Sequence, residues 1–247
     1  MRQRNDLDFY NRVAEEWWCE TAKIYALSHL NPARFQYFDR HIPSWSGLKV
    51  LDVGCGGGFS CEFMARRGAI VSGIDQSNQC IETARKHAAA NHFAIDYRHG
   101  YAEQLPYADR SFDAVVCVDV LEHVADLGRT IAEIHRVLKP GGIFCFDTIN
   151  RTLRSRLMMI WLLEDLMRQI PQGIHDWQKF IQPEELRALM RETGFAAIEF
   201  CGFNVLGETV GENIAAYRHY RRTGAFKIRF SDNLSVMYIG IAKRLSV

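Results

Sequence analysis

Short apolar runs alternate with longer amphipathic segments through most of this chain. Runs at residues 49–53, 69–74, 95–98, 112–118 and 143–148 predict strands, and segments 59–67, 78–90 and 128–138 predict helices. Such an alternation is typical of parallel βαβ units with right-handed crossovers. A further helix at 183–193 ends at a glycine, and we expect later strands at 196–202 and 234–242 to be antiparallel. The pattern predicts an α/β fold with a seven-stranded, mostly parallel sheet and helices on both faces.

Three segments fall outside this alternation. Residues 1–46 are rich in aromatic and charged side chains, and we expect them to form a helical extension before a core at 47–150. Residues 151–182 form an insertion after the fifth strand. Residues 183–247 carry the last helix and strands, interrupted by an irregular stretch at 203–229. We expect all of these segments to belong to one domain.

Composition and charge narrow the class of protein. Hydrophobic residues make up 48% and charged residues 24% of the 247 positions, which is typical of a globular protein with a substantial core. Thirty basic against 29 acidic residues give a net charge of +1, which argues against a nucleic-acid partner. The seven cysteines are scattered singly, we find no secretory signal, and the longest apolar run, 157–163, is too short to span a bilayer. We therefore expect a cytoplasmic protein with reduced thiols.

The strand at 49–53 runs into the loop Asp52-Val53-Gly54-Cys55-Gly56-Gly57-Gly58. In an open parallel sheet, ligands bind beyond the carboxyl ends of the strands, where this loop, Asp75 and the loop at 100–106 should meet. The glycines permit close backbone approach to a ligand, the next helix offers free N–H groups to a carboxylate, and Asp75 is placed to hold ribose hydroxyls. A nicotinamide dinucleotide would use similar architecture, but its fingerprint is G-x-G-x-x-G, which this loop does not follow.

The loop and Asp75 resemble the D-x-G-x-G-x-G pattern and strand-terminal acid of class I methyltransferases. Two further motifs are spaced as in that superfamily, namely Leu105-Pro106 before Ser111-Phe112-Asp113, and Leu138-Lys139-Pro140-Gly141-Gly142. The resemblance implies a Rossmann-like fold and S-adenosyl-L-methionine as the cofactor. The alternative is that the glycines serve turns in an unrelated α/β protein.

Rarer motifs resemble those of the ubiquinone-biosynthesis O-methyltransferases. They lie between residues 9 and 202 and are His29-Leu30-Asn31-Pro32-x-Arg34, Asp119 before Leu121-Glu122-His123-Val124, Thr148-Ile149-Asn150-Arg151, and Gly173-Ile174-His175-Asp176-x-x-Lys179-Phe180-Ile181-x-Pro183-x-Glu185-Leu186. The resemblance implies that the methyl donor is bound by Arg34, Gly54, Asp75 and Val118, with Arg34 suited to the methionyl carboxylate. We expect neighbouring loop residues to complete that site, namely Asp52, Gly56, Gln76, Ala102 and Glu103.

The family's metal-binding pattern, E-x-x-E-H, falls on Asp119, Glu122 and His123, with aspartate in place of the first glutamate. A helical turn could present side chains at this i, i+3, i+4 spacing together, and two carboxylates with an imidazole suit Mg²⁺. A metal would lower the pKa of a catechol hydroxyl and orient it. Alternatively, Glu122 and His123 line the acceptor mouth without a metal, and His123 acts as general base. His175 is a second acid–base candidate, with an ordering hydrogen bond to a lid as its alternative role.

The resemblance also implies methyl transfer to a phenolic hydroxyl of a polyprenylated catechol, a small lipid-tailed acceptor. Residues 151–170 predict a mostly apolar helix with arginines at its start, which suits peripheral contact with the inner membrane surface. Docking on the core or on a partner subunit is the alternative. After residue 202 the chain departs from the family, since Phe203-Asn204-Val205 replaces Y-N-P. Methylation of another phenol or small metabolite, or a non-catalytic role in binding S-adenosylmethionine, therefore stays open, and no pattern specifies an oligomeric state.

Overall fold

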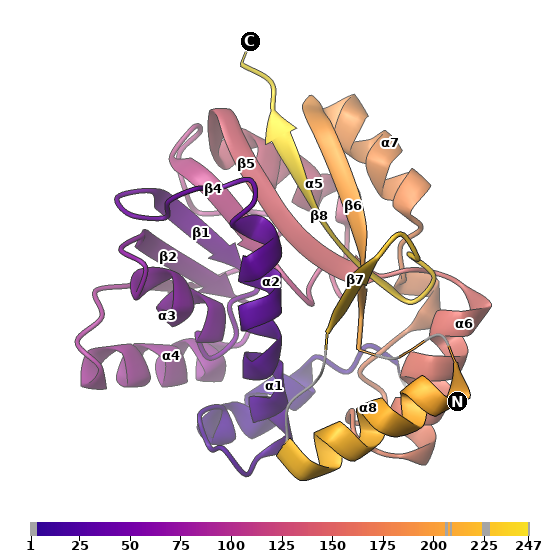
Figure 1. Cartoon of the computed structure of the whole chain (residues 1–247). Coiled ribbons are helices and arrows are strands. Elements are labelled where there is room, and N and C mark those ends of the chain that lie inside the picture. Colours follow the sequence, from indigo (N-terminus) through magenta and orange to yellow (C-terminus); the bar gives the residue numbers. More distant parts are fainter. Residues whose placement is uncertain (1–3, 206, 208, 224–227, 247) are drawn as a thin grey trace.

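The computed structural model describes residues 4–205, 207, 209–223 and 228–246 (Figure 1). At its centre, one sheet has the strand order β3-β2-β1-β4-β5-β8-β6-β7. The strands are β1 (Lys49–Val53), β2 (Ile70–Asp75), β3 (Asp96–His99), β4 (Phe112–Cys117), β5 (Leu138–Ile149), β6 (Phe195–Asn204), β7 (Arg229–Ser231) and β8 (Met237–Arg244). The first five are parallel, and β8, β6 and β7 add antiparallel pairs beside β5.

The strand order reverses at β1, and this reversal creates a crevice at one edge of the sheet. Val50 of β1 lies opposite Val71 of β2 on one side and opposite Ala114 of β4 on the other. Loops that leave β1 and β4 run to opposite faces of the sheet, so a ligand can enter between them. The last four residues of β4 are buried, which explains why this strand has a continuous apolar run.

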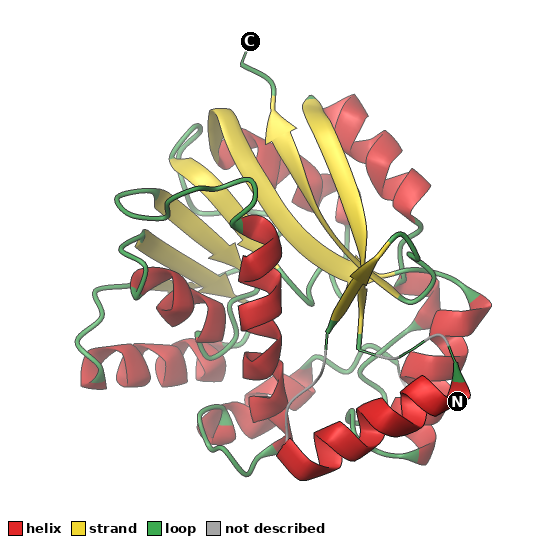
Figure 2. Cartoon of the chain, in the orientation of Figure 1, coloured by secondary structure: helices red, strands yellow, loops and turns green. Residues whose placement is uncertain are grey.

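Helices cover both faces of the sheet (Figure 2). One apolar core includes side chains of α2 (Asn31–Phe38), α3 (Phe59–Ala65) and α4 (Asn78–Ala90). The other includes side chains of α5 (Leu127–Val137) and α7 (Pro183–Thr193). These two layers bury both faces of the sheet, whose carboxyl edge carries the loops of the site.

Local capping fixes where several of these helices begin and end. The Ser77 hydroxyl accepts a hydrogen bond from the Cys80 N–H at the start of α4, and the Asp126 carboxylate accepts one from the Arg129 N–H at the start of α5. Gly194, at φ +102°, ends α7 in the left-handed conformation that glycine adopts without strain. The stop signals read from the sequence therefore act through ordinary cap geometry.

The remaining helices gather at the end of the sheet where the parallel strands finish (Figure 1). They are α1 (Asp8–Val13), the 3₁₀ helices Ala14–Glu16, Lys23–Leu30 and Trp177–Lys179, α6 (Leu153–Ser155), a π-helix (Arg156–Leu166) and α8 (Val210–Thr223). Trp17 packs against Phe59 at the start of α3, with ring centroids 5.6 Å apart. Within the described part of the chain, no helix has the length and apolar character needed to cross a membrane.

Most predicted elements are confirmed, and three expectations are corrected. The sheet has eight strands rather than seven, because the short edge strand β7 pairs with the end of β6. β5 begins earlier than predicted, because Leu138 pairs with Phe112 ahead of a bulge. The stretch at 203–229 is not wholly irregular, since it contains α8. The apolar residues of α8 are too few to give the sequence a clear helical period.

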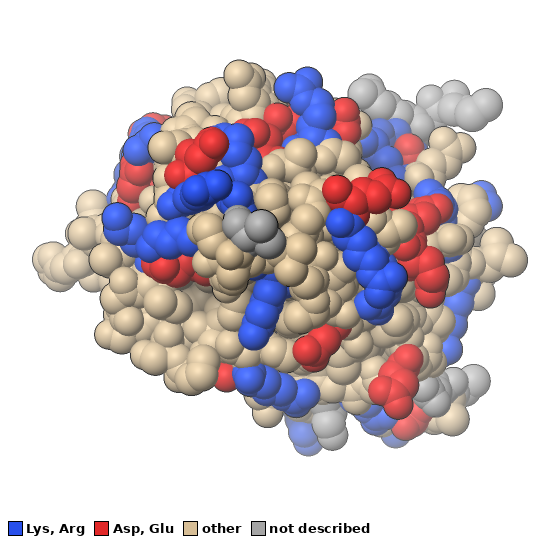
Figure 3. Space-filling view, turned by 90° about the horizontal axis from the view of Figure 1, so that it is seen from above, with Lys and Arg blue, Asp and Glu red and all other residues tan. Residues whose placement is uncertain are grey.

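Charged side chains are mixed in sign on the face seen in Figure 3, where lysines and arginines lie among aspartates and glutamates. This mixture matches the near balance of 30 basic and 29 acidic residues in the sequence. The fields of interspersed charges of opposite sign largely cancel at a distance, so the electrostatic potential of this face is weak beyond its immediate surface.

Candidate active site

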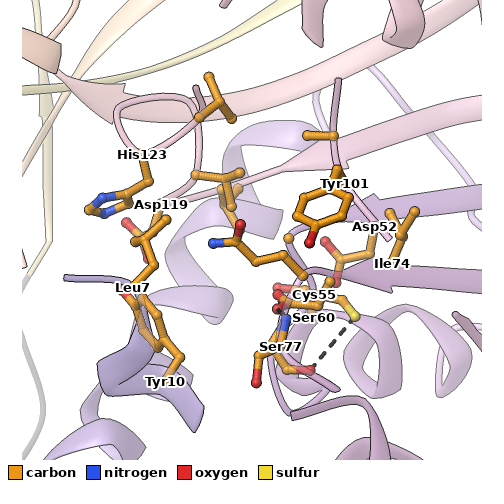
Figure 4. A pocket seen from close by; sticks show the side chains of 18 of the residues that line it. Leu7, Tyr10, Asp52, Cys55, Ser60, Ile74, Ser77, Tyr101, Asp119 and His123 are labelled. Carbon is orange, nitrogen blue, oxygen red and sulfur yellow. Dashed lines mark hydrogen bonds between the residues drawn. The ribbon is translucent and has the colours of Figure 1, made fainter. Parts of the chain in front are cut away.

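A cavity of about 320 Å³, the donor cavity, lies at the carboxyl ends of β1, β2 and β4. In Figure 4, Asp119, His123 and Tyr10 stand on one side of it, and Asp52 and Tyr101 stand on the other. All of the residues predicted to bind the methyl donor line this cavity, namely Arg34, Asp52, Gly54, Gly56, Asp75, Gln76, Ala102, Glu103 and Val118. The fold thus brings together one concave surface from loops that are far apart in sequence.

Two glycines of the loop after β1 are required by the side chains that pack against them. At Gly54, with φ +73°, an added Cβ would lie 2.2 Å from Cγ2 of Val120. At Gly56, with φ +50°, it would lie 2.3 Å from the indole of Trp17. From the sequence, these glycines are expected to permit a tight turn and close approach of a ligand. The structure adds a second reason, because protein side chains press on the loop from both sides.

Asp75 organises the floor of the donor cavity. Its two carboxylate oxygens accept hydrogen bonds from the Gly56 N–H and the Ser77 N–H, each at 2.8 Å. Burial raises the pKa of Asp75, while these two N–H groups oppose the shift. One carboxylate therefore fixes the glycine loop relative to the start of α4.

Asp52 lies deeper and has a different environment. Its side chain accepts a hydrogen bond from the Cys61 thiol at 3.2 Å, and burial raises its pKa to about 7. This partner lies on α3, so Asp52 ties the loop to the helix that follows it. Two other predicted ligands also have protein partners: the Glu103 carboxylate accepts the Ala125 N–H at 2.7 Å, and the Gln76 carbonyl contacts His99 Nε2 at 3.0 Å.

Arg34 is buried between two carboxylates. Its Nε donates to Asp147 at 2.5 Å, and its Nη2 pairs with Asp119. Asp147 also accepts the Asp119 N–H at 2.8 Å, which holds Asp119 at a left-handed φ of +56°. Arg34 was expected to face the methionyl carboxylate. It does line the donor cavity, but part of its guanidinium is already engaged in this network.

Trp17 supplies an unpaired hydrogen-bond donor in the wall of the donor cavity. Its buried Nε1–H has no partner among the described residues. A buried N–H without a partner is costly, so a ligand atom that accepts from it would be stabilised. Together with the Asp75 carboxylate, this donor fits a polar, nucleoside-sized ligand.

A second, larger cavity of about 640 Å³, the acceptor cavity, adjoins the first. Its walls come from the 3₁₀ helix Lys23–Leu30, the π-helix and α8, and they are mostly apolar. Polar side chains gather near the junction of the two cavities, where Tyr10, Leu27, Asp119 and His123 line both of them. Glu122 and His175 line the acceptor cavity only. A group bound at this junction would therefore meet a ligand in each cavity.

The segment that carries Asp119, Glu122 and His123 is a turn, so the predicted helical presentation is wrong. The His123 N–H closes the turn onto the Val120 carbonyl at 2.8 Å. Glu122 accepts a hydrogen bond from the Thr148 hydroxyl at 2.7 Å, and burial followed by the nearby Asp119 raises its pKa to about 8. Burial, followed by repulsion from His175 and Lys179, lowers the pKa of His123 to about 3. Each of the three side chains therefore has its own partners within the protein.

These environments do not fit the expected Mg²⁺ site. Asp119 is paired with Arg34, and Glu122 accepts the Thr148 hydroxyl, so both carboxylates are already engaged with the protein. Nδ1 of His123 faces the Asn5 amide at 2.8 Å. Across the described residues, no cluster of three or more histidine, cysteine, aspartate or glutamate side chains is arranged to hold a metal ion. We derive no chemical step through a metal.

His175 lies beside His123, with ring centroids 5.5 Å apart and planes inclined by 25°. Its Nδ1 is 3.2 Å from Oε2 of Glu164, a carboxylate with no exposed side-chain surface on the π-helix. The structure thus places both candidate acid–base histidines in one pair at the polar end of the acceptor cavity. Glu164 was not among the predicted site residues.

Comparison with known proteins agrees with this geometry. The family model described as "Methyltransferase domain" matches residues 51–146. A ubiquinone biosynthesis O-methyltransferase from Neisseria meningitidis is 42% identical over 81% of this chain and 86% of its own length. One from Roseobacter denitrificans is 41% identical over 78% of this chain and 83% of its own. The chain belongs to the ubiquinone biosynthesis O-methyltransferase family. It is an S-adenosylmethionine-dependent methyltransferase.

Solved structures show the same fold at lower sequence identity. A SAM-dependent methyltransferase from Thermotoga maritima has a TM-score of 0.63 and 18% identity, covering 95% of this chain and 97% of its own. An S-adenosylmethionine dependent methyltransferase from Mesorhizobium loti has a TM-score of 0.59 and 22% identity, covering 86% and 98%. These structures support the Rossmann-like methyltransferase fold of this family member.

Four residues of the site were missed by sequence reasoning. Asp147 had a readable signal, because it is an acidic residue directly after the apolar run Ile143–Phe146 of β5. Trp17, Asn5 and Glu164 had none, because each contacts the site only through long-range packing. The family motifs mark the loops that touch ligands and leave out the side chains that hold those loops in place.

Proposed function

We propose that this methyltransferase transfers a methyl group to a phenolic hydroxyl of a catechol that carries a long apolar, polyprenyl-type tail. The observation that carries the proposal is the acceptor cavity, whose walls are mostly apolar and whose histidines and carboxylates lie where it meets the donor cavity. Its other polar lining residues include Lys23, Gln169 and Arg218. A phenolic head at the junction and a hydrocarbon tail between the π-helix and α8 would match that distribution. The relatives named for ubiquinone biosynthesis support this class of acceptor.

In this proposal, the donor cavity binds S-adenosylmethionine. Asp75 is the acceptor for ribose hydroxyls, and the loop around Gly54 and Gly56 approaches the methionyl part. Val118 and Ala102 line the wall beside the adenosine. The sulfonium supplies an already activated methyl group. The task of the protein is therefore to align oxygen, methyl and sulfur, and to accept the phenolic proton.

The histidine pair and Glu122 lie where that proton must leave. Burial raises the pKa of Glu122 to about 8, so its protonated form is available to donate a hydrogen bond to the acceptor. His123 and His175 present imidazoles beside it. This division supports one group that orients the catechol and another that removes its proton.

A panel of acceptors tests the proposal with radiolabelled methyl donor. It compares an unprenylated catechol with catechols that carry tails of increasing length, and includes a prenylated benzene without hydroxyls as the blank. We expect kcat/KM to rise with tail length, since each buried methylene contributes about 0.8 kcal/mol at most. Activity confined to unprenylated phenols would contradict the proposed acceptor and indicate a small metabolite instead.

We also propose that the α6 and π-helix segment contacts a membrane surface while the acceptor enters. Leu153, Leu157 and Trp161 are exposed by 76%, 53% and 58%, and Arg154 and Arg156 belong to the same segment. Apolar side chains next to basic ones suit an interface with anionic lipids.

Sedimentation with liposomes tests this contact. We expect binding to anionic vesicles to fall in Leu157→Asp and to be retained in the control Ile70→Asp, whose side chain is 57% exposed on β2. Failure of the unmodified protein to sediment with anionic vesicles would contradict membrane contact and leave the acceptor assignment to the panel above.

A further inference from the structure

The two histidines at the polar end of the acceptor cavity differ in the group behind each ring. Nδ1 of His175 faces the Glu164 carboxylate at 3.2 Å, whereas Nδ1 of His123 faces the side-chain oxygen of Asn5 at 2.8 Å. The rings otherwise lie close and nearly parallel, 5.5 Å apart. A carboxylate and a neutral amide affect the adjacent imidazole very differently, so the pair is chemically unequal.

Hydrogen bonding assigns the same tautomer to both rings. The Asn5 Nδ2 donates to the His123 carbonyl at 3.1 Å, so the Asn5 side-chain oxygen is the atom that faces Nδ1 of His123. This oxygen can only accept, so Nδ1 of His123 is the donor. The Glu164 carboxylate can only accept, so Nδ1 of His175 also donates. Each ring therefore keeps its lone pair on Nε2. For His175, no described residue provides a hydrogen-bond partner to Nε2, and the ring lines the acceptor cavity.

The difference appears when Nε2 takes a proton. A positive His175 ring lies against a negative carboxylate, which stabilises it. A positive His123 ring would lie in a buried place against a neutral amide, with Lys179 nearby. Two adjacent cationic rings would also repel each other. The carboxylate behind its ring therefore makes His175 the better placed of the two to receive a proton from a bound acceptor.

Glu164 is built to hold that charge. Its Oε1 accepts hydrogen bonds from Arg4 at 2.5 Å and from the Gly173 N–H at 2.6 Å. Its Oε2 accepts from the N–H and from Nδ1 of His175. Glu164 is not among the residues that line either cavity, so it acts through His175 and does not touch an acceptor.

We propose that Glu164 is a positioning residue that makes His175, rather than His123, the proton acceptor in methyl transfer. This inference rests on the proposed function of the acceptor cavity. In the step, the phenolic O–H gives its proton to Nε2 of His175 while the oxygen forms a bond to the donor methyl. The carbon–sulfur bond breaks, and its electron pair neutralises the sulfonium. The products are an aryl methyl ether, S-adenosylhomocysteine and an imidazolium that returns its proton to solvent.

A matched pair of isosteric variants isolates the role of Glu164. Glu164→Gln removes the carboxylate behind His175. Asp165→Asn removes the other carboxylate bound by Arg4, at 3.1 Å, without touching His175. We expect the maximal rate with a catechol acceptor to fall about 10- to 100-fold in Glu164→Gln, with little change in KM, and to stay at the wild-type value in Asp165→Asn. Donor affinity by calorimetry checks that both variants are folded.

Nitrogen NMR of histidine-labelled full-length protein provides a readout that needs no acceptor. We expect His175 to show the Nδ1–H tautomer in the wild type and in Asp165→Asn, and to lose it in Glu164→Gln, with the His123 signals retained. Unchanged His175 signals in Glu164→Gln would overturn the pairing. Changed signals with a wild-type rate would overturn the catalytic consequence.

An electron-poor catechol, already ionised at the assay pH, separates proton removal from a structural effect. We expect His175→Gln to be about 100-fold slow with an ordinary catechol and to recover most of its rate with the ionised one. This variant also keeps the inference testable if Glu164→Gln does not fold. Equal losses on both acceptors would overturn the role of His175. If the wild type methylates no catechol, the proposed function fails, while the NMR result still decides the pairing.

Discussion

The donor and acceptor cavities are neighbours built by different means. The donor cavity is formed largely by loops that leave β1, β2, β3 and β4, and side chains of the segment before β1, such as Trp17 and Arg34, complete it. The acceptor cavity is formed mainly by side chains of helices that precede β1 or are inserted after β5 and β6, including the π-helix and α8. Donor recognition is thus tied to the sheet itself, whereas acceptor recognition depends on segments that can change without altering the sheet. The difference explains why the donor is easier to read from the sequence than the acceptor.

The largest expected effect is on the donor cavity alone and comes from replacing Asp75. Asp75→Ala removes two hydrogen bonds that hold the donor loop and the predicted ribose ligand. We expect the Kd of S-adenosylmethionine to rise about 100-fold, since hydrogen bonds to a charged group contribute about 1.5–3 kcal/mol each. Calorimetry with Asp96→Ala as control, an exposed acid paired with Arg98, makes the comparison. An unchanged Kd would remove Asp75 from the donor site.

A smaller effect tests whether the glycine loop is confined by protein as well as by ligand. Gly54→Ala should lower the free energy of unfolding by about 2 kcal/mol, because the new methyl meets Val120 and the backbone has positive φ. Gly54→Ala combined with Val120→Ala should recover part of the loss in a denaturant titration, since the steric contact is relieved. If the pair shows no recovery, the cost lies in the backbone alone.

The smallest effect concerns the wall that α8 gives the acceptor cavity. Ile214→Asp should raise KM for a long-tailed catechol about tenfold, since a charge replaces apolar contact, and leave KM for an unprenylated catechol unchanged. Leu245→Asp is the matched control, because Leu245 is also 48% exposed and lies outside both cavities. If Ile214→Asp changes KM by the same factor for both acceptors, the tail does not run along α8.

The sequence predicts the donor half of the site well because its determinants are local. A strand that ends in Asp52 and glycines, and another that ends in Asp75, place ligand groups within a few residues of the sheet edge. All of the predicted donor residues accordingly line one cavity. Their individual contacts with the donor stay predictions.

The acceptor half escapes prediction for two physical reasons. The pairs that set its chemistry, Asn5 with His123 and Arg4 with Glu164, join positions more than a hundred residues apart. The turn at Asp119 has a backbone conformation imposed by Asp147, so the spacing of the motif did not reveal its geometry. The i, i+3, i+4 spacing of Asp119, Glu122 and His123 predicts a metal site, but the contacts of these side chains within the protein do not fit one.

The contacts of residues 4–6 have a practical consequence for handling the protein. Arg4 holds Glu164, Asn5 holds His123, and the Asp6 N–H donates to the Gly173 carbonyl at 3.0 Å. An affinity tag or fusion partner joined just before these residues would disturb the contacts that Arg4 makes with Glu164 and Asn5 makes with His123. β8 ends at the opposite end of the sheet (Figure 1), so a tag after residue 247 would leave the site untouched. Kinetic constants measured with the two tag positions should therefore differ, and the C-terminal one should match untagged protein.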